Sequence, residues 1–267
     1  AYTVLASGGV GGLYRHSTNF RHLTGDALAI AGKHNIELQN PDYVQIHPTT
    51  FYTKHPEDRS FLISESVRGE GARLYDKNMN RFVNELLPRD LLSQKIHEQM
   101  AKDDTDFVWE DLRTIPAETL RHHFPNIVEH CREMGYDVFK ECIPVVPAQH
   151  YFMGGVKVDY QSRSSMENLY VVGEAACNGV HGKNRLASNS LLESLVFARR
   201  AAQDMAEHDL KNASPQNASE IADYLASHVD FTPYQDIQTL AETYHHLATQ
   251  AITLGQNPEG RKEFLYV

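Results

Sequence analysis

Apolar and polar positions alternate in two different ways along the chain, and the first way predicts strands joined to helices. Residues 2–6 form a short β-prone run, and residues 27–31 form a small helix that ends at a glycine. Residues 169–173 have the pattern of a buried strand ending in glycine, which is typical of a parallel sheet. Residues 191–210 place leucine and alanine on one helical face. These segments predict an α/β domain.

The region 42–152 has a different pattern. Short apolar runs such as 61–63 are mixed with amphipathic helices expected at 90–100 and 117–134. This mixture predicts an α+β domain inserted into the α/β domain. The expected regions are 1–41 and 153–211 for the α/β domain, 42–152 for the inserted domain, and 212–267 for a short C-terminal helical region with helices near 218–228 and 235–253.

Composition narrows the classes of partner. The 267 residues contain 25 lysines and arginines against 35 aspartates and glutamates, which gives a formal net charge of −10. No basic stripe is available to replace the counterions of a nucleic acid, so we expect no nucleic-acid partner. No run approaches the roughly 18 apolar residues of a membrane span, and residues 1–12 do not resemble a signal peptide. We therefore expect a cytoplasmic protein without a membrane partner.

The cysteines and histidines do not predict a metal site. The three cysteines are widely spaced and form no CxxC pair. The adjacent histidine pairs at 122–123 and 245–246 point to different sides of a helix, and the chain has no HExxH pattern. We expect reduced thiols and no bound metal.

A glycine-rich turn, Ser7-Gly8-Gly9 followed by residues 10–12, comes directly after the first predicted strand. It resembles a dinucleotide-binding loop only loosely, because GGxGG is not GxGxxG and no second strand ending in an acidic residue follows at the right distance. The simpler interpretation is a turn at a strand end. Glycines there would also let a flat ligand approach the backbone closely.

Five polar side chains lie in segments whose composition is typical of catalytic or binding sites. His47 precedes a proline, Glu65 lies near two glycines, and His150 comes shortly before a glycine pair. Arg89 lies in the first turn of a predicted helix, where a cation is unfavourable to the helix dipole, and Arg185 lies ahead of the long helix. Each also has an ordinary structural interpretation. The two histidines could be hydrogen-bonded core residues, the two arginines could form surface ion pairs, and the glutamate could lie on a solvated face.

Taken together and in order, the segments resemble the flavoprotein family of succinate dehydrogenase, fumarate reductase and L-aspartate oxidase. The matching motifs are HPT at His47–Thr49, the RGEGA segment at Ser64–Ala72, RD at Arg89–Asp90, HYxxGG at His150–Gly155, GE at Gly173–Glu174 and the NRL segment at His181–Leu192. The pattern at 185–193 resembles the L-aspartate oxidase branch. Lys183 departs from the alanine usual in the family.

The resemblance implies an FAD enzyme that oxidises L-aspartate to iminoaspartate in NAD biosynthesis, with oxygen or fumarate as acceptor. Arg185 would grip one carboxylate through two parallel hydrogen bonds. His47 and His150 would donate to carboxylate oxygens and add positive charge, and Glu65 would pair with the amino group. Arg89 would give a proton to fumarate, an unusual role for a guanidinium that requires a dry site.

The same resemblance implies a set of contacts for FAD, bound non-covalently. Glu174 would lie by the ribityl chain, and the N-terminal N–H groups of the long helix would stabilise negative charge on the reduced flavin. The expected cofactor-binding residues are Ser7, Gly8, Gly9, Glu174, Ser190 and Leu191.

One family feature is not found. The strand, GxGxxG turn and helix that hold the FAD pyrophosphate do not precede Ala1. We therefore expect a C-terminal portion of an aspartate oxidase that is inactive by itself and from which FAD is absent. The alternatives are a flavoprotein of the succinate dehydrogenase or fumarate reductase type, and a non-catalytic capping-domain fragment. Quinolinate synthase is the expected protein partner.

Overall fold

The computed structural model describes residues 2–54, 59–212, 223–224, 226–228, 230 and 232–255. The chain divides into two compact units. The first unit contains the described residues of Ala1–Leu13, Leu23–Tyr43 and Phe152–Lys262, and the second contains those of Tyr14–His22 and Val44–Tyr151. The second unit therefore takes the segment 14–22 in addition to the inserted region expected at 42–152.

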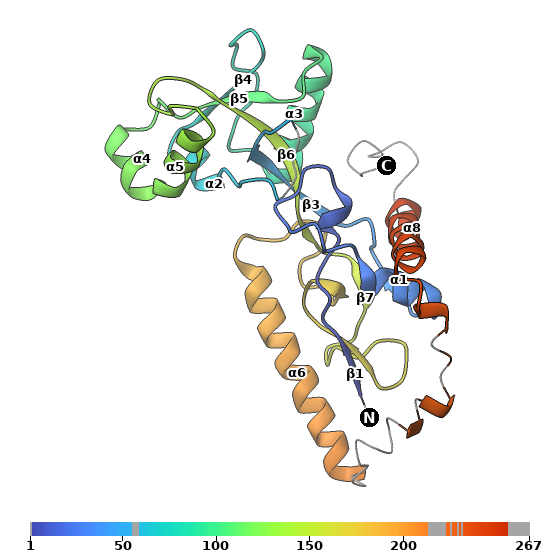
Figure 1. The fold of residues 1–267 in the computed structure, drawn as a ribbon. Helices are drawn as coiled ribbons and strands as arrows, with labels where there is room; N and C mark the ends of the chain where they lie inside the picture. Colours follow the sequence, from blue (N-terminus) through green and yellow to red (C-terminus); the bar gives the residue numbers. More distant parts are fainter. Residues whose placement is uncertain are drawn as a thin grey trace. The chain divides into compact units, whose positions relative to one another are not determined.

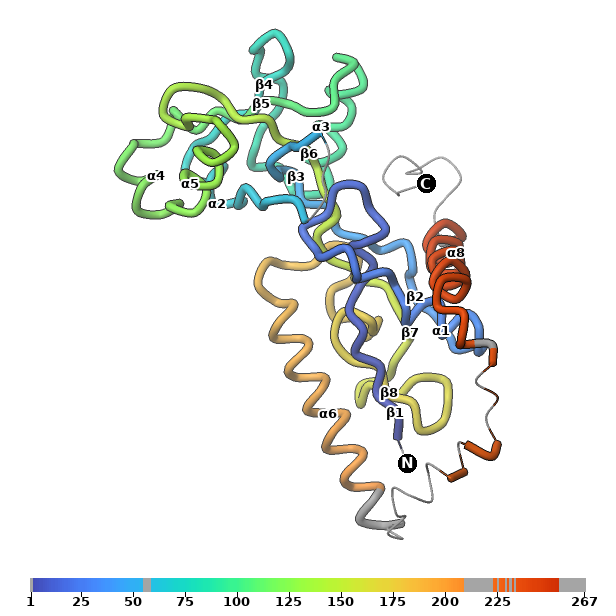
Figure 2. The backbone as a smooth tube through the Cα atoms, in the orientation of Figure 1, coloured from blue at the N-terminus to red at the C-terminus, as the bar shows by residue number. Residues whose placement is uncertain are grey.

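The first unit is built on two small sheets. Strands β1 and β8 pair in parallel with Val4 opposite Tyr170, and they lie side by side in Figure 2. The second sheet has the order β2-β7-β9, in which β7 is antiparallel to β2 and parallel to β9. The strands are β1 (Thr3–Leu5), β2 (Leu38–Gln39), β7 (Gly155–Lys157), β8 (Leu169–Val171) and β9 (Ala176–Cys177).

Helices cover these short strands. Helix α8 packs on α1, as Figure 1 shows, and α1 in turn contacts β7. Ala27, Ala31, Val156 and Val171 are fully buried in the shared core. The helices and 3-10 turns of this unit are η1 (Gly11–Leu13), α1 (Asp26–Lys33), η2 (Gly173–Ala175), α6 (Asn189–Asn212), η3 (Thr232–Tyr234) and α8 (Ile237–Gly255).

The second unit is a four-stranded sheet with helices against it. Its strand order is β3-β6-β5-β4, and β5 is antiparallel to both of its neighbours. The elements are β3 (Val44–Phe51), α2 (Glu65–Gly69), β4 (Arg73–Tyr75), α3 (Arg89–Asp103), β5 (Val108–Asp111), α4 (Ala117–His123), α5 (Pro125–Glu133) and β6 (Ile143–Phe152). The predicted α/β and α+β fold class is confirmed.

Helix α3 fixes the edge strand of this sheet. Leu92 and Ile96, four residues apart on α3, are fully buried in the core, and α3 packs against β3. Burying side chains of this kind contributes about 1.5 to 3 kcal/mol each. Pro48 is tolerated within β3 because an edge strand does not need every backbone N–H for pairing. Arg89 and the strand residues near His47 are thereby held on a rigid support.

Several elements differ from the sequence prediction. The helix expected at 117–134 is two helices, because Pro125 disfavours helical geometry at Phe124, whose φ is −130°. Strands β3 and β6 were not predicted, since both carry proline and polar residues that resemble loop sequence. Most of the helix expected near 218–228 lies outside the described residues.

Candidate functional site

Two histidines of the second unit come together where β3 and β6 are neighbours. His47 lies in the middle of β3, and His150 lies near the end of β6. Their ring centroids are 5.4 Å apart and the ring planes meet at 65°. Strand pairing thus brings together two predicted site residues that are distant in the sequence.

His47 is a neutral imidazole. Its side chain is 1% exposed, and its Nδ1 lies 3.0 Å from the carbonyl oxygen and 3.2 Å from the backbone nitrogen of Thr49. Burial, followed by the nearby charge of Arg68, lowers the pKa of His47 well below 6.5. The expectation that His47 adds positive charge is therefore wrong. At neutral pH the ring offers a hydrogen bond only.

Arg89, the first residue of α3, is held by two side chains. Its Nε and Nη2 donate to a single oxygen, Oε2 of Glu65, at 2.8 and 2.6 Å. Its Nη1 donates to Oε1 of Gln45 at 3.3 Å. The Arg89 side chain is 13% exposed, whereas that of Glu65 is 55% exposed. Glu65 pairs with the arginine of the RD motif, and this ion pair offsets the unfavourable position of a cation at a helix start.

Arg68 is a buried cation that connects this cluster to the sheet. It is 2% exposed, its Nη1 donates to the hydroxyl of Thr49, and its Nε donates to the carbonyl oxygen of Glu85 at 3.3 Å. Burial lowers the pKa of Arg68, while the carboxylates of Glu110 and Glu65 act in the opposite direction.

The prediction missed four supporting residues of this cluster. Thr49 and Arg68 stand inside the motifs that carry the resemblance, and Gln45 stands two residues before the HPT motif, so a position in or beside a motif was the signal that could have found them. Thr18, whose hydroxyl lies 2.8 Å from Nδ1 of His150, has no comparable signal. Its contact depends on tertiary structure alone.

Among the predicted cofactor residues of the first unit, the glycine turn and Glu174 lie together. The turn after β1 contains Gly8 with φ +79°, and a Cβ placed on Gly9 would lie only 2.5 Å from Oε1 of Glu174. The turn and η2 are therefore in contact. Glu174 accepts a hydrogen bond of 2.8 Å from the backbone nitrogen of Phe152, and burial raises its pKa to about 7.

The start of α6 completes this set. A Cβ on Gly173 would lie 3.7 Å from the hydroxyl oxygen of Ser194, so η2 lies against the beginning of α6. Leu191 and Leu192 in the first turn are 76% and 59% exposed. A half-buried carboxylate, close glycine backbone, helix N–H groups and exposed apolar surface fit a flat, hydroxyl-bearing and partly anionic group such as FAD.

Arg185 belongs to the first unit and is 6% exposed. Its backbone nitrogen donates to the sulfur of Met153 at 3.3 Å, and its Nη1 donates to the carbonyl oxygen of Leu186 at 3.3 Å. The unusual Lys183 places its ammonium 5.7 Å from the ring centroid of Tyr43, within the range of a cation–π contact.

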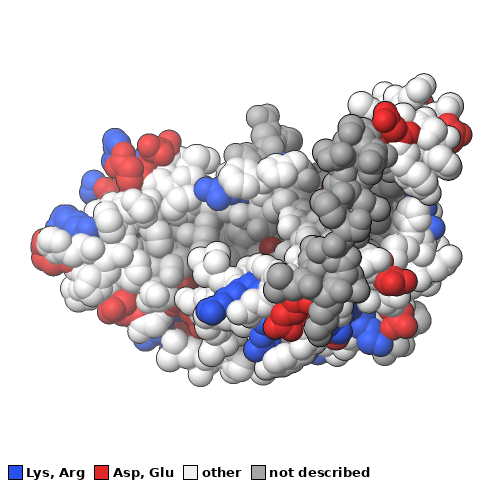
Figure 3. Space-filling model, turned by 90° about the horizontal axis from the view of Figure 1, so that it is seen from below, with Lys and Arg blue, Asp and Glu red and all other residues white. Residues whose placement is uncertain are grey.

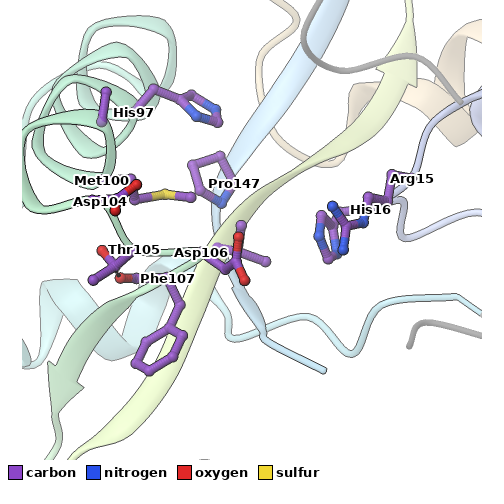
Figure 4. A pocket seen from close by; sticks show the side chains of 11 residues that line it. Arg15, His16, His97, Met100, Asp104, Thr105, Asp106, Phe107 and Pro147 are labelled. Carbon is purple, nitrogen blue, oxygen red and sulfur yellow. Dashed lines mark hydrogen bonds between the residues drawn. The ribbon is translucent and has the colours of Figure 1, made fainter. Parts of the chain in front are cut away.

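A cavity of about 600 Å³ lies elsewhere in the second unit (Figure 4). His97, Met100 and Asp104 line one side of it and His16 another, and none of the predicted site residues lines it. Neither His47 nor His150 is among its lining residues, so the cavity is separate from the histidine pair. Burial, followed by the charge of Arg15, lowers the pKa of His16 to about 4.

A family model described as "FAD binding domain" matches residues 1–191. The chain belongs to this FAD-binding family. It is 55% identical over 202 residues to the L-aspartate oxidase of Clostridium perfringens, with 76% of this chain and 46% of that protein covered. It is 44% identical over 221 residues to the L-aspartate oxidase of Neisseria meningitidis, with 80% and 44% covered. The chain spans about half the length of these relatives.

Two solved structures share the fold. E. coli quinol fumarate reductase FrdA superimposes with a TM-score of 0.72 at 33% identity over 84% of this chain and 42% of that chain. Mycobacterium smegmatis Sdh1 gives a TM-score of 0.66 at 30% identity over 91% of this chain and 43% of its own. The predicted resemblance to these flavoproteins is confirmed, and family membership indicates FAD as the cofactor, as the sequence predicts.

In the part of the chain that the structure describes, no helix is long and apolar enough to cross a bilayer. In the same residues, no group of three or more histidine, cysteine, aspartate or glutamate side chains could hold a metal ion. On the face that Figure 3 shows, acidic and basic side chains are interspersed.

Proposed function

We propose that the protein oxidises L-aspartate to iminoaspartate with FAD, a step of NAD biosynthesis. The observation that carries the proposal is the cluster of His47, His150 and Arg89 with its Glu65 partner, in a chain 55% identical to an L-aspartate oxidase. When bound, FAD supplies hydride chemistry, with oxygen or fumarate as the final acceptor. The protein's residues bind and orient the dicarboxylate.

Arg89 is the proposed proton donor when fumarate is reduced. Its contacts with Glu65 and Gln45 fix the direction of the guanidinium, and its low exposure limits competing water. His47 and His150 are proposed to donate hydrogen bonds to carboxylate oxygens. Arg185 is proposed to hold a carboxylate by two parallel hydrogen bonds, which only a planar guanidinium can make.

Glu65 is proposed to distinguish aspartate from succinate. Both of its contacts with Arg89 use Oε2, so the proposal assigns the ammonium of aspartate to Oε1. A charge-assisted hydrogen bond of this kind is worth about 1.5 to 3 kcal/mol. The carboxylate thus has two tasks, the orientation of Arg89 and recognition of the amino group.

Ser7, Gly8, Gly9, Glu174, Ser190 and Leu191 are proposed to contact FAD. Gly8 and Gly9 would present backbone to it, Glu174 would accept hydrogen bonds from its hydroxyls, and Ser190 and Leu191 would offer N–H groups at the start of α6. This assignment is supported by the contacts between the glycine turn, η2 and α6 in the first unit.

The test is the pair Arg89→Lys and Arg113→Lys in the FAD-loaded protein. Arg113 also chelates a carboxylate of the second unit, that of Asp111, but it is not part of the proposed site. Arg89→Lys should lower kcat for fumarate reduction about 100-fold or more while KM changes less than about tenfold. Arg113→Lys should change neither constant. Equal losses in both variants would contradict the proposed role of Arg89.

A substrate panel separates the alternative activity. The similarity to E. coli quinol fumarate reductase favours a fumarate or succinate enzyme as the second candidate. Anaerobic flavin bleaching by L-aspartate but not by succinate supports aspartate oxidation, and the reverse preference supports the alternative. A chain that binds neither FAD nor dicarboxylate would instead fit a non-catalytic fragment.

We also propose a cytoplasmic location and quinolinate synthase as the partner that consumes iminoaspartate. The support is chemical, because an imine hydrolyses in water and a nearby consumer limits that loss. Cell fractionation tests the location. Co-purification of the two proteins, with a mixing experiment that compares quinolinate yield, tests the partnership.

A further inference from the structure

The cavity of the second unit has an apolar floor. Val146 and Pro147 of β6 are buried lining residues, and Met100 of α3 and Phe107, just before β5, are half-buried ones. The ring of Phe107 is supported by that of Tyr52, whose centroid lies 5.0 Å away. A volume of about 600 Å³ is that of a site for a small organic molecule. The floor therefore offers such a molecule a firm apolar surface.

The rim of the cavity carries charges of both signs. The lining residues Arg15, Asp104 and Asp106 are all exposed. Asp104 is the C-cap residue of α3, where the negative end of the helix dipole adds to its charge. Figure 4 shows Asp104 on the α3 side of the cavity and Arg15 on the opposite side. A ligand with a cationic group at one end and an anionic group at the other matches this distribution.

His16 adds a hydrogen-bonding group on the Arg15 side (Figure 4). Its Nδ1 is buried and has no hydrogen-bond partner among the residues that the structure describes. The lowered pKa of about 4 keeps this ring neutral at pH 7, so it can accept or donate one hydrogen bond at Nδ1, depending on the tautomer. A buried polar atom without a partner is unfavourable, and a polar ligand group would relieve it in either case.

We propose that this cavity binds a free α-amino acid with an apolar side chain. The ammonium would lie by the carboxylates of Asp104 and Asp106, the carboxylate by the guanidinium of Arg15, and the side chain on the apolar floor. Simple amines, fatty acids and internal peptide residues each lack at least one of these groups. Two carboxylates face one guanidinium, so an amino acid with a second carboxylate is disfavoured. The ligand thus differs from the dicarboxylate of the proposed function.

Calorimetric titration of the purified chain with L-phenylalanine and three analogues tests the proposal. N-acetyl-L-phenylalanine lacks the ammonium, L-phenylalaninamide lacks the carboxylate, and glycine lacks the apolar side chain. One equivalent of L-phenylalanine should bind, and each analogue should bind about tenfold more weakly or worse. An analogue that binds as well as L-phenylalanine would overturn the proposal. So would the absence of binding by both L-phenylalanine and L-leucine at about 10 mM.

Two variants assign the ends of the ligand. Arg15→Gln should weaken binding of L-phenylalanine about tenfold and leave L-phenylalaninamide unaffected, because the amide has no carboxylate to lose. Asp104→Asn should weaken both of these ligands but not the N-acetyl compound, and asparagine tolerates the φ of +52° at this position. Losses that do not depend on which charge the ligand carries would contradict the assignment.

Glu133→Gln is the matched control. Glu133 is an exposed carboxylate of the second unit at the end of α5, and it does not line the cavity. The variant should bind L-phenylalanine as the wild type does, and a loss equal to that of Asp104→Asn would reduce the effect to overall charge and overturn the site. Since binding is measured without turnover, these outcomes do not depend on whether the chain oxidises L-aspartate.

Discussion

The two units hold their candidate site residues by different means. In the second unit, side chains hold one another: Glu65 and Gln45 hold Arg89, and Thr18 holds His150. In the first unit, backbone lies against backbone or a half-buried carboxylate, as at Gly9 beside Glu174. Polar substitutions should therefore harm the second unit most, whereas added side-chain volume should harm the first.

The largest expected effect is in the first unit, at Gly154. A Cβ there would lie 1.9 Å from the carbonyl oxygen of Asn40, a backbone atom that no rotamer change can move. Gly154→Ala should therefore lower the free energy of unfolding by about 3 kcal/mol or more. Urea denaturation of the purified chain measures it.

Gly32→Ala is the matched control for that experiment. Gly32 lies exposed in α1, with nothing within 4 Å of an added Cβ. The substitution should be neutral or stabilise by up to about 1 kcal/mol, because alanine favours helix. Similar losses at both glycines would mean that close backbone packing is not what distinguishes the first unit.

The next-largest effect is expected at Glu110, a buried carboxyl of the second unit that, unlike the candidate site residues there, accepts no hydrogen bond among the described residues. Glu110 is fully buried in β5, and neither side-chain oxygen has a hydrogen-bond partner among the described residues. Burial raises the pKa of Glu110 from 4.5 to about 7, although the charge of Arg68 opposes the shift. Between these two values the folded state binds more protons than the unfolded state, so stability falls as pH rises through this window.

Glu110→Gln should remove that pH dependence. The variant should be more stable than wild type by roughly 3 kcal/mol at pH 8, with the difference disappearing near pH 4. Thermal unfolding across this range measures it. Glu118→Gln, at a side chain 75% exposed, should change stability by less than about 0.5 kcal/mol at either pH. A Glu110 effect that is independent of pH would contradict the argument.

Local sequence rules predicted much of the fold, and their failures have physical reasons. Helix α3 and strand β8 follow from periodicity and apolar runs. The break between α4 and α5 follows from Pro125, which the helical periodicity concealed. Strand β6 carries Pro144 and Pro147, so its sequence does not favour a strand, and only pairing with distant strands makes it one.

The candidate site divides in the same way. Motifs identified His47, His150 and Arg89, because their chemistry is encoded in short segments. They did not reveal that burial would make His47 neutral, since burial depends on the whole unit. They also did not reveal the contact of Thr18 with His150, which joins segments far apart in the chain. Which side chains contact a site residue depends on the tertiary structure and is not encoded in short motifs.

The smallest expected effect compares how the two units start a helix. In the second unit, the N-cap residue before α2 is Ser64, whose hydroxyl accepts a 3.2 Å hydrogen bond from the backbone nitrogen of Ser66. In the first unit, the N-cap residue before α1 is Gly25, with φ +78° and no side-chain cap. Ser64→Ala should lower the free energy of unfolding by about 1 kcal/mol, and Ser64→Asp should retain stability, because aspartate also caps.

Thr24→Ala, beside the glycine start of α1, is the control and should change stability by less than about 0.5 kcal/mol, since its hydroxyl donates only to the exposed carboxylate of Asp26. Denaturant titration of the three variants decides. A larger loss at Thr24 than at Ser64 would reverse the proposed contrast between side-chain support in the second unit and backbone geometry in the first.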